Sequence, residues 1–188
     1  MKFYQPLDLP FECYNKDAVM QITENFDSSK FYIWKVDLSV FSNEFISFLE
    51  SIGCKLFYSE LFHTPAFRNL VWHIDTDTPL DIMRLNFVWG STKHFMQWGE
   101  PVKKNYINNV VPTVTGTVSI NFKDHEVKTV ESYCINSPTI VHVGVPHRVV
   151  NYDDASRFCL SVNIHTGNEK LMFDRAKELF SEYMLGSK

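Results

Sequence analysis

The feature that most constrains this chain is a run of short segments with alternating or β-branched character over roughly residues 70–164. Successive side chains of a strand point to opposite faces, so this pattern is typical of strands in a sheet with one buried face. About eight such segments, at intervals of roughly ten residues, predict a sandwich or a barrel. The expected strands are residues 70–74, 82–89, 95–98, 113–122, 127–133, 139–143, 147–151 and 157–164.

Helices are expected on either side of this run. Residues 31–38 predict a strand, and residues 43–51 predict a helix with Ser42 as its N-cap and Gly53 at its end. Residues 168–185 read as an amphipathic helix packed on the outside of the sheet. The turns between the strands are expected at residues 77–79, 99–101, 123–125 and 152–154.

The composition fits one compact, mainly β domain covering residues 1–188, with its β core at about 70–165. Apolar residues make up 45% of the chain and charged residues 21%, which excludes a disordered or fibrous protein. A net charge of -4 argues against a nucleic-acid partner. The start lacks a signal-peptide pattern, no apolar stretch is long enough to span a membrane, and the four dispersed cysteines predict reduced thiols. We therefore expect a cytoplasmic protein.

Three residues combine the ligand types of a metal site. His73 and Asp75 lie two residues apart at the end of an apolar strand, so both side chains share one face. His147 follows a Gly-Val-Pro bend at the start of a later strand. Two imidazoles and a carboxylate on one side of a six-coordinate ion leave the opposite side open, as a non-haem Fe(II) centre requires. His142 is an alternative to His147, and Asp77 to Asp75.

A cation is expected beside this metal site. Arg157 lies ten positions after His147, beyond the turn 151–156, and antiparallel pairing of the flanking strands would return it to the vicinity of His147. Arg157, Cys159 and Ser161 would share a face of their strand. A buried arginine needs an anionic partner, and a dicarboxylate that chelates the metal at one end could supply it at the other.

These residues resemble the Fe(II)/2-oxoglutarate-dependent dioxygenases. The resemblance rests on His73-x-Asp75, on Gly144-Val145-Pro146-His147-Arg148-Val149-Val150-Asn151, on Arg157 and on Arg84-Leu85-Asn86-Phe87, and it covers roughly residues 70–164. It is most similar to small aspartyl/asparaginyl- or prolyl-hydroxylase-like members. It implies a double-stranded β-helix, also called a jelly roll or cupin-like fold, with iron on His73, Asp75 and His147.

The resemblance also implies that Arg157 binds the remote carboxylate of 2-oxoglutarate. The frequent Arg-x-Ser pattern is Arg157-Phe158-Cys159 here, and the next serine is Ser161, so the hydroxyl contact to the cosubstrate differs. Asn86 or Arg84 could help to hold it.

The implied activity is hydroxylation of a protein side chain or a small metabolite, with O₂ consumed and succinate and CO₂ released. Two other classes fit the same ligands: a non-redox cupin-like metal-binding or sensor protein, and a zinc-dependent hydrolase or lyase. Neither has a particular need for a cation that faces the metal, so Arg157 distinguishes the oxygenase from both.

Overall fold

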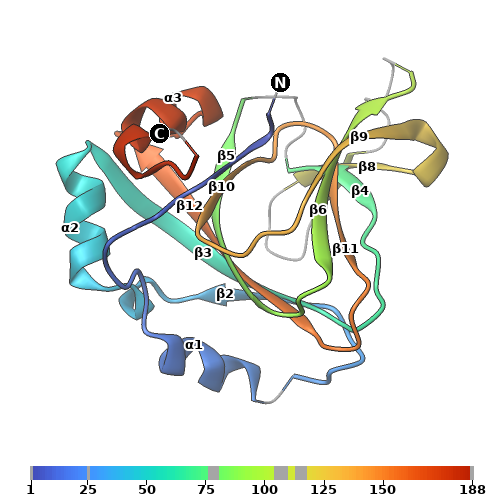
Figure 1. The fold of residues 1–188 in the computed structure, drawn as a ribbon, viewed down its shortest axis with the longest axis horizontal. Helices are drawn as coiled ribbons and strands as arrows, with labels where there is room; N and C mark the ends of the chain where they lie inside the picture. The colour runs from blue at the N-terminus through green and yellow to red at the C-terminus, as the bar shows by residue number, and fades with distance from the viewer. Residues whose placement is uncertain (1, 25, 76–80, 104–109, 113–117, 187–188) are drawn as a thin grey trace.

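Two antiparallel β-sheets form the centre of the computed structural model, which describes residues 2–24, 26–75, 81–103, 110–112 and 118–186 (Figure 1). In spatial order, the larger sheet contains β1 (Tyr4–Pro6), β10 (Thr139–His142), β5 (Met83–Gly90), β12 (Arg157–Thr166), β3 (Cys54–Thr64) and β2 (Tyr32–Val36), with β13 (Glu169–Lys170) paired to β12. The smaller sheet contains β7 (Val110–Pro112), β8 (Val118–Phe122), β4 (Trp72–Ile74), β11 (His147–Asn151), β6 (His94–Pro101) and β9 (Val127–Tyr133).

The strand pairing identifies the architecture as a double-stranded β-helix. β6 pairs with β9, β5 with β10, β4 with β11 and β3 with β12, always antiparallel, as in one long hairpin. Successive strands of each arm alternate between the two sheets, so the hairpin winds into a helix instead of lying flat. This confirms the expected mainly β, jelly-roll fold.

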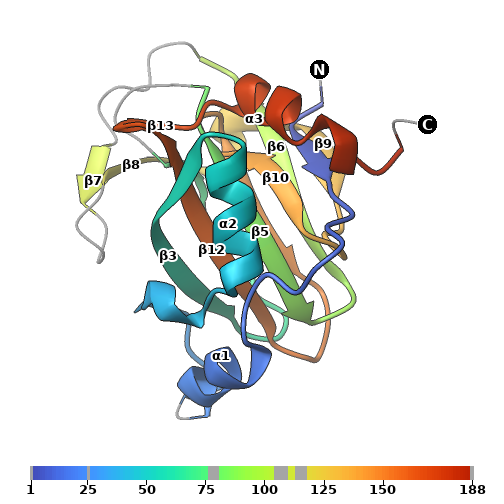
Figure 2. The ribbon, with the colours of Figure 1, turned by 90° about the vertical axis from the view of Figure 1, so that its left-hand side faces the viewer.

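The outer face of the larger sheet is covered by helices, as Figure 2 shows for α2 (Asn43–Ser51). Phe45 and Leu49 of α2 are fully buried in a cluster with Leu160 and Val162 of β12, which alternate with the inward-facing residues of that strand. Ser42 caps α2 by accepting a hydrogen bond from the backbone N–H of Phe45, as expected. This apolar face of β12 therefore packs against α2 on the outside of the sheet. The opposite face of β12 is left to line the interior between the two sheets.

Parts of the sequence-based expectation need correction. β3, β1 and α1 (Lys16–Thr23) were not expected, and β3 belongs to the central hairpin, so a core beginning near residue 70 is too narrow. The expected C-terminal helix is instead β13, α3 (Phe173–Leu179) and the short η4 (Ser181–Tyr183). Residues 99–101 continue β6 past a register shift instead of forming a turn.

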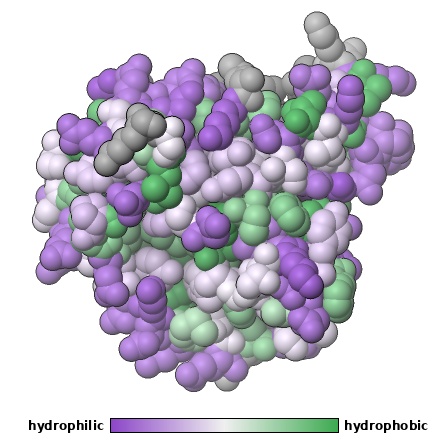
Figure 3. Space-filling model, viewed as in Figure 1, coloured by the Kyte–Doolittle hydropathy of each residue, from purple (hydrophilic) through white to green (hydrophobic). Residues whose placement is uncertain are grey.

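The face of the molecule seen in Figure 3 is mixed in character. Figure 3 shows hydrophobic side chains in small patches among hydrophilic ones on the face seen there. The four cysteines are free thiols, as expected. No helix in the described part of the chain has both the length and the apolar character needed to span a membrane.

Candidate metal centre

The two candidate histidine ligands lie directly opposite each other on paired strands. His147, the first residue of β11, is in register with His73 of β4, and their ring centroids are 4.3 Å apart. The neighbours of His73, Trp72 and Ile74, are buried in an apolar cluster. Because side chains alternate along a strand, burying these two residues turns His73 to the opposite face. Asp75 follows directly after β4, on the same side as His73.

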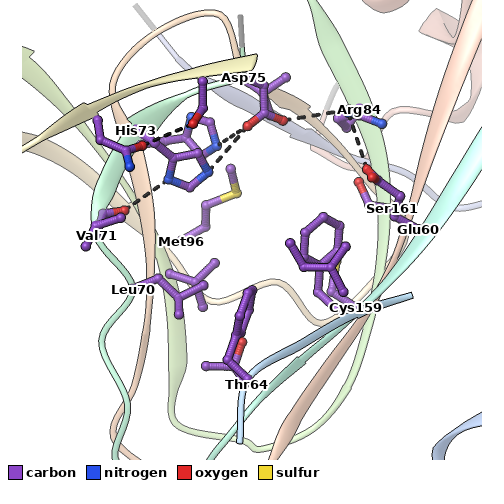
Figure 4. Close-up of a pocket in the computed structure, with 18 of the residues that line it drawn as sticks. Glu60, Thr64, Leu70, Val71, His73, Asp75, Arg84, Met96, Cys159 and Ser161 are labelled. Carbon is purple, nitrogen blue, oxygen red and sulfur yellow. Dashed lines mark hydrogen bonds and ion pairs between the residues drawn. The ribbon is translucent and has the colours of Figure 1, made fainter. Parts of the chain in front are cut away.

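These three side chains converge closely enough to hold one ion. Asp75 Oδ1 lies 3.3 Å from His73 Nε2 and 3.7 Å from His147 Nε2, and the three ligand atoms all lie within 4.8 Å of one another. Figure 4 shows the imidazole of His73 beside the carboxylate of Asp75 at one end of a cavity. The sequence-predicted ligands His73, Asp75 and His147 are therefore brought together.

Backbone carbonyls orient both imidazoles for metal binding. His73 Nδ1 lies 3.0 Å from the carbonyl oxygen of Val71, and His147 Nδ1 lies 2.9 Å from that of Val145. A carbonyl oxygen only accepts hydrogen bonds, so each Nδ1 carries the proton and donates it. Each Nε2 then faces the carboxylate, and its lone pair is available to an ion once it carries no proton.

The electrostatics keep the three groups in distinct protonation states. Burial would raise the pKa of Asp75, but the hydrogen bond to His73 and the positive charge of Arg84 outweigh it and lower that pKa. Burial and the neighbouring His73 lower the pKa of His147 to about 4. Burial also acts to lower the pKa of His73, but the contact with Asp75 raises it overall. At neutral pH the site therefore contains a carboxylate and a neutral His147.

A cavity of about 530 Å³ extends from these residues between the sheets. The larger sheet lines it with alternate residues of β12, β5 and β3. Asn86 of β5 is in register with Ser161 of β12, and Ser161 with Glu60 of β3. Thr64 of β3 is in register with Arg157. The polar residues on this wall are Glu60, Thr64, Arg84, Asn86, Arg157 and Ser161.

Several buried polar atoms on this wall lack a partner. Arg157 is only 2% exposed, and its Nε has no hydrogen-bond partner among the described residues. The same holds for Thr64 Oγ1, Asn86 Oδ1 and Arg84 Nη1. Burial raises the pKa of the adjacent Cys159, so its neutral thiol does not balance the charge of Arg157. Leaving such groups unpaired costs free energy, and a polar ligand in the cavity would satisfy them.

The placement of Arg157 follows from a different pairing than the sequence suggested. β11 and β12 belong to different sheets, so they do not form the expected pair; β12 pairs with β5 and β3. Arg157 nevertheless lines the cavity that holds His147, because the cavity lies between the two sheets. The expected shared face of Arg157, Cys159 and Ser161 is observed.

The rival ligands separate clearly from the site. His142 Nε2 faces Asp81 Oδ1 at 3.4 Å, and its ring stacks on Phe173, so it lies outside the ligand cluster. Asp77 lies outside the described residues. The sequence analysis missed Glu60, Thr64 and Tyr58 because it did not predict β3. The one available signal was the acidic Glu60 within the largely apolar residues 56–62.

Comparisons with known proteins leave the family of this chain open. No family model and no curated protein matches it. Among solved structures, it is similar to oxalate oxidase in complex with the substrate analogue glycolate, with 10% identity, a TM-score of 0.38, and coverage of 89% of this chain and 79% of the other. A second oxalate oxidase structure gives 9% identity, a TM-score of 0.33, and coverage of 100% and 98%.

The cysteine peptidase Peruvianin-I from Thevetia peruviana latex gives 13% identity, a TM-score of 0.33, and coverage of 88% and 94%. Similarities this low do not transfer an activity. The chain is characterised by its own topology and ligand cluster: it is a double-stranded β-helix with a candidate His-Asp-His metal site.

Proposed function

We propose that this protein is an Fe(II)- and 2-oxoglutarate-dependent oxygenase that hydroxylates its substrate. The observation that carries the proposal is the buried Arg157, whose Nε lacks a partner, in the same cavity as His73, Asp75 and His147. Iron, 2-oxoglutarate and O₂ together supply the oxidant that inserts one oxygen atom into a C–H bond, while the other oxygen enters succinate as CO₂ leaves.

The candidate ligands suit this metal. Two imidazole nitrogens and one carboxylate oxygen form the mixed set that non-haem Fe(II) accepts, and they leave positions open for further ligands. Zinc accepts the same residues, so the ligand set alone does not separate an oxygenase from a hydrolase. The feature that favours an oxygenase over a hydrolase is the buried cation Arg157 on the cavity wall formed by the larger sheet.

The charges on the wall favour a dianionic ligand. Among the described lining residues that are at least partly buried, the guanidinium groups of Arg84 and Arg157 balance the carboxylates of Glu60 and Asp75. A divalent ion then adds two positive charges that no lining residue offsets. A dicarboxylate restores neutrality, which matters because an uncompensated charge out of water is costly.

Individual residues have distinct roles in this proposal. Arg157 binds the remote carboxylate of 2-oxoglutarate with charge-assisted hydrogen bonds. The Ser161 hydroxyl can donate a further hydrogen bond to the ligand, and Asn86 is adjacent to it across β12 and β5. The unpartnered atom of Asn86 is Oδ1, which only accepts, so it does not bind a carboxylate oxygen. Cys159 lies between Arg157 and Ser161 on this face and contributes volume instead of a hydroxyl.

The cavity mouth favours an uncharged substrate group. The exposed lining residues include the apolar Phe31, Val71 and Val118, and Arg68 is the one exposed charged residue among the described residues that line the cavity. Desolvating a charged group beside such side chains costs free energy. We therefore propose an apolar side chain or a neutral metabolite as the group that is hydroxylated.

The test compares two ligands that differ in the remote carboxylate. Calorimetric titration of the Mn(II)-loaded protein with 2-oxoglutarate and with 2-oxopentanoate, which lacks that carboxylate, measures the preference. The wild type should prefer 2-oxoglutarate by about 10- to 100-fold, because a hydrogen-bonded charge contributes about 1.5–3 kcal/mol. Arg157→Met should abolish the preference while Mn(II) affinity is retained.

The control is Arg175→Met, which removes an exposed guanidinium that pairs with Glu178. It should leave the preference intact. A wild-type protein that binds both ligands equally would refute the proposed cosubstrate and favour the sensor or hydrolase alternatives.

A further inference from the structure

Arg84 is the second buried cation of the cavity, and it lies between two carboxylates. It is 7% exposed, its Nε is 3.8 Å from Asp75 Oδ2, and its Nη2 is 3.5 Å from Glu60 Oε2. Figure 4 shows the guanidinium linked to both acidic side chains at the end of the cavity nearest the metal ligands. Its position differs from that of Arg157, which has no ion pair among the described residues.

β3 holds the Arg84 guanidinium in place. Arg84 Nη2 donates a hydrogen bond of 2.6 Å to Tyr58 Oη, and the guanidinium carbon lies 4.8 Å from the centroid of the Tyr58 ring. Tyr58 and Glu60 are two residues apart on β3, so their side chains share a face. A planar guanidinium held by a hydrogen bond, a ring face and an ion pair has little freedom to reorient.

The two oxygens of Asp75 consequently have different partners. Oδ1 faces the Nε2 atoms of both histidines, while Oδ2 faces Arg84 Nε. A carboxylate in this environment presents one oxygen to an ion bound by His73 and His147. If both oxygens bound the ion, Asp75 would occupy one of the positions that a chelating cosubstrate and O₂ require.

We propose that Arg84 is a positioning residue that keeps Asp75 a one-oxygen metal ligand. This inference rests on the metal centre of the proposed function, and it gives Arg84 a role other than the cosubstrate contact expected from the sequence. Arg84 acts through Asp75: it holds Oδ2 away from the metal and leaves the remaining coordination positions vacant for ligands.

The first test measures metal binding in the absence of any 2-oxo acid. Co(II) is titrated into the metal-free protein while its visible d–d absorption is recorded. Arg84→Gln should weaken Co(II) binding by about 10- to 100-fold, the usual effect of removing a partner of a metal ligand. The d–d spectrum of the saturated variant should also change, because Asp75 becomes free to bind through both oxygens. Arg84→Lys keeps the charge and should recover part of the affinity.

Two further variants guard against a merely structural effect. Tyr58→Phe removes the 2.6 Å hydrogen bond but no charge, and should weaken Co(II) binding by a smaller factor, about threefold. Glu60→Gln leaves the contact between Arg84 and Asp75 in place and should keep the wild-type d–d spectrum. Circular dichroism of each variant checks that the fold is retained, and Tyr58→Phe still decides the question if Arg84→Gln does not fold.

The second test separates the roles of the two arginines. In the metal-saturated protein, Arg84→Gln should retain the preference for 2-oxoglutarate over 2-oxopentanoate that Arg157→Met loses. Wild-type Co(II) affinity and spectrum in Arg84→Gln would overturn the inference, and loss of the preference would make Arg84 a cosubstrate ligand instead. If the wild type itself bound no Co(II), the metal centre of the proposed function would fail, which is a distinct result.

Discussion

At the scale of single residues, the energetic cost of Arg157 is the strongest pointer to a ligand. A guanidinium that is 2% exposed and lacks an ion pair among the described residues opposes folding, because an unpaired charge out of water costs several kcal/mol. Trp72, by contrast, is 1% exposed and packs in an apolar cluster, as a buried residue ordinarily does. Residues that work against stability in this way commonly serve binding.

If His73, Asp75 and His147 bind an ion as proposed, competition with protons gives metal binding a pH dependence of defined slope. Each histidine that is protonated must lose its proton when an ion binds. His147, with its pKa lowered to about 4, is already neutral above pH 5, whereas the pKa of His73 is raised above 6.5. Asp75 is ionised throughout, because its pKa is lowered. One proton, from His73, is therefore displaced per ion between about pH 5 and 6.5.

Metal affinity should accordingly fall about tenfold for each pH unit lost in that interval, and level off above the pKa of His73. Zn(II) titrations at several pH values measure the slope, and calorimetry in two buffers of different ionisation enthalpy counts the protons. A hundredfold fall per pH unit would mean that both histidines are protonated and would contradict the asymmetry between them.

The sequence indicated which candidate ligands the fold brings together more completely than it indicated their surroundings. His73 and Asp75 are two residues apart on one strand, so their shared face follows from strand geometry alone. The choice of His147 over His142 needed the register of β11 against β4. Glu60 could not be placed at all, since its contact with Arg84 joins two strands that are not neighbours in the sheet.

At the scale of secondary-structure elements, β3 shows why alternation can fail to reveal a strand. Ser59, Glu60 and Leu61 are consecutive and all buried, because one face of β3 lines the cavity and the other contributes to the core under the helices. Leu61 reads as an apolar core position, whereas Glu60 is polar and equally inaccessible. A strand buried on both faces loses the alternation of polar and apolar residues on which the expected strands were based.

The junction of β5 and β12 depends on a glycine. Gly90 has a φ of +93° and is in register with Arg157, and a Cβ added there would lie 2.3 Å from the carbonyl oxygen of Ser156. Gly90→Ala should therefore lower the free energy of unfolding by about 2–4 kcal/mol, through backbone strain and displacement of the Ser156 backbone. Because the same displacement moves Arg157, 2-oxoglutarate binding should weaken as well.

Gly53 provides the matched control. Its φ is +73°, but an added Cβ would meet nothing within 4 Å. Gly53→Ala should cost about 1 kcal/mol from the left-handed backbone alone and leave ligand binding unchanged. Urea denaturation compares the two variants, and equal losses of stability would show that the contact with Ser156 is unimportant.

At the scale of the whole molecule, the winding of the long hairpin assembles the site. It brings His73 in β4 opposite His147 in β11, and it places Arg157 at the start of β12 on the facing sheet. Strand spacing predicted a sandwich or a barrel but not which strands pair, because pairing between distant segments leaves no local pattern. The expected pairing of β11 with β12 failed for this reason: neighbours in sequence alternate between sheets here.

The same architecture explains how one cavity combines a candidate metal site and a cation. The smaller sheet supplies the histidines and the larger sheet supplies Arg84, Asn86, Arg157 and Ser161, so the cavity has a ligand-bearing side and a charge-bearing side. A hydrolase or a sensor has no particular need of the second side. We propose that a single diacid contacts both sides.

The most direct measurement is the visible absorption of the anaerobic protein with one equivalent of Fe(II), before and after addition of 2-oxoglutarate. A bidentate 2-oxo acid on Fe(II) gives a metal-to-ligand charge-transfer band, and we predict that it appears with 2-oxoglutarate, is absent with succinate, and requires far more cosubstrate in Arg157→Met. A protein that binds Fe(II) stoichiometrically yet shows no such band at saturating 2-oxoglutarate would contradict the account.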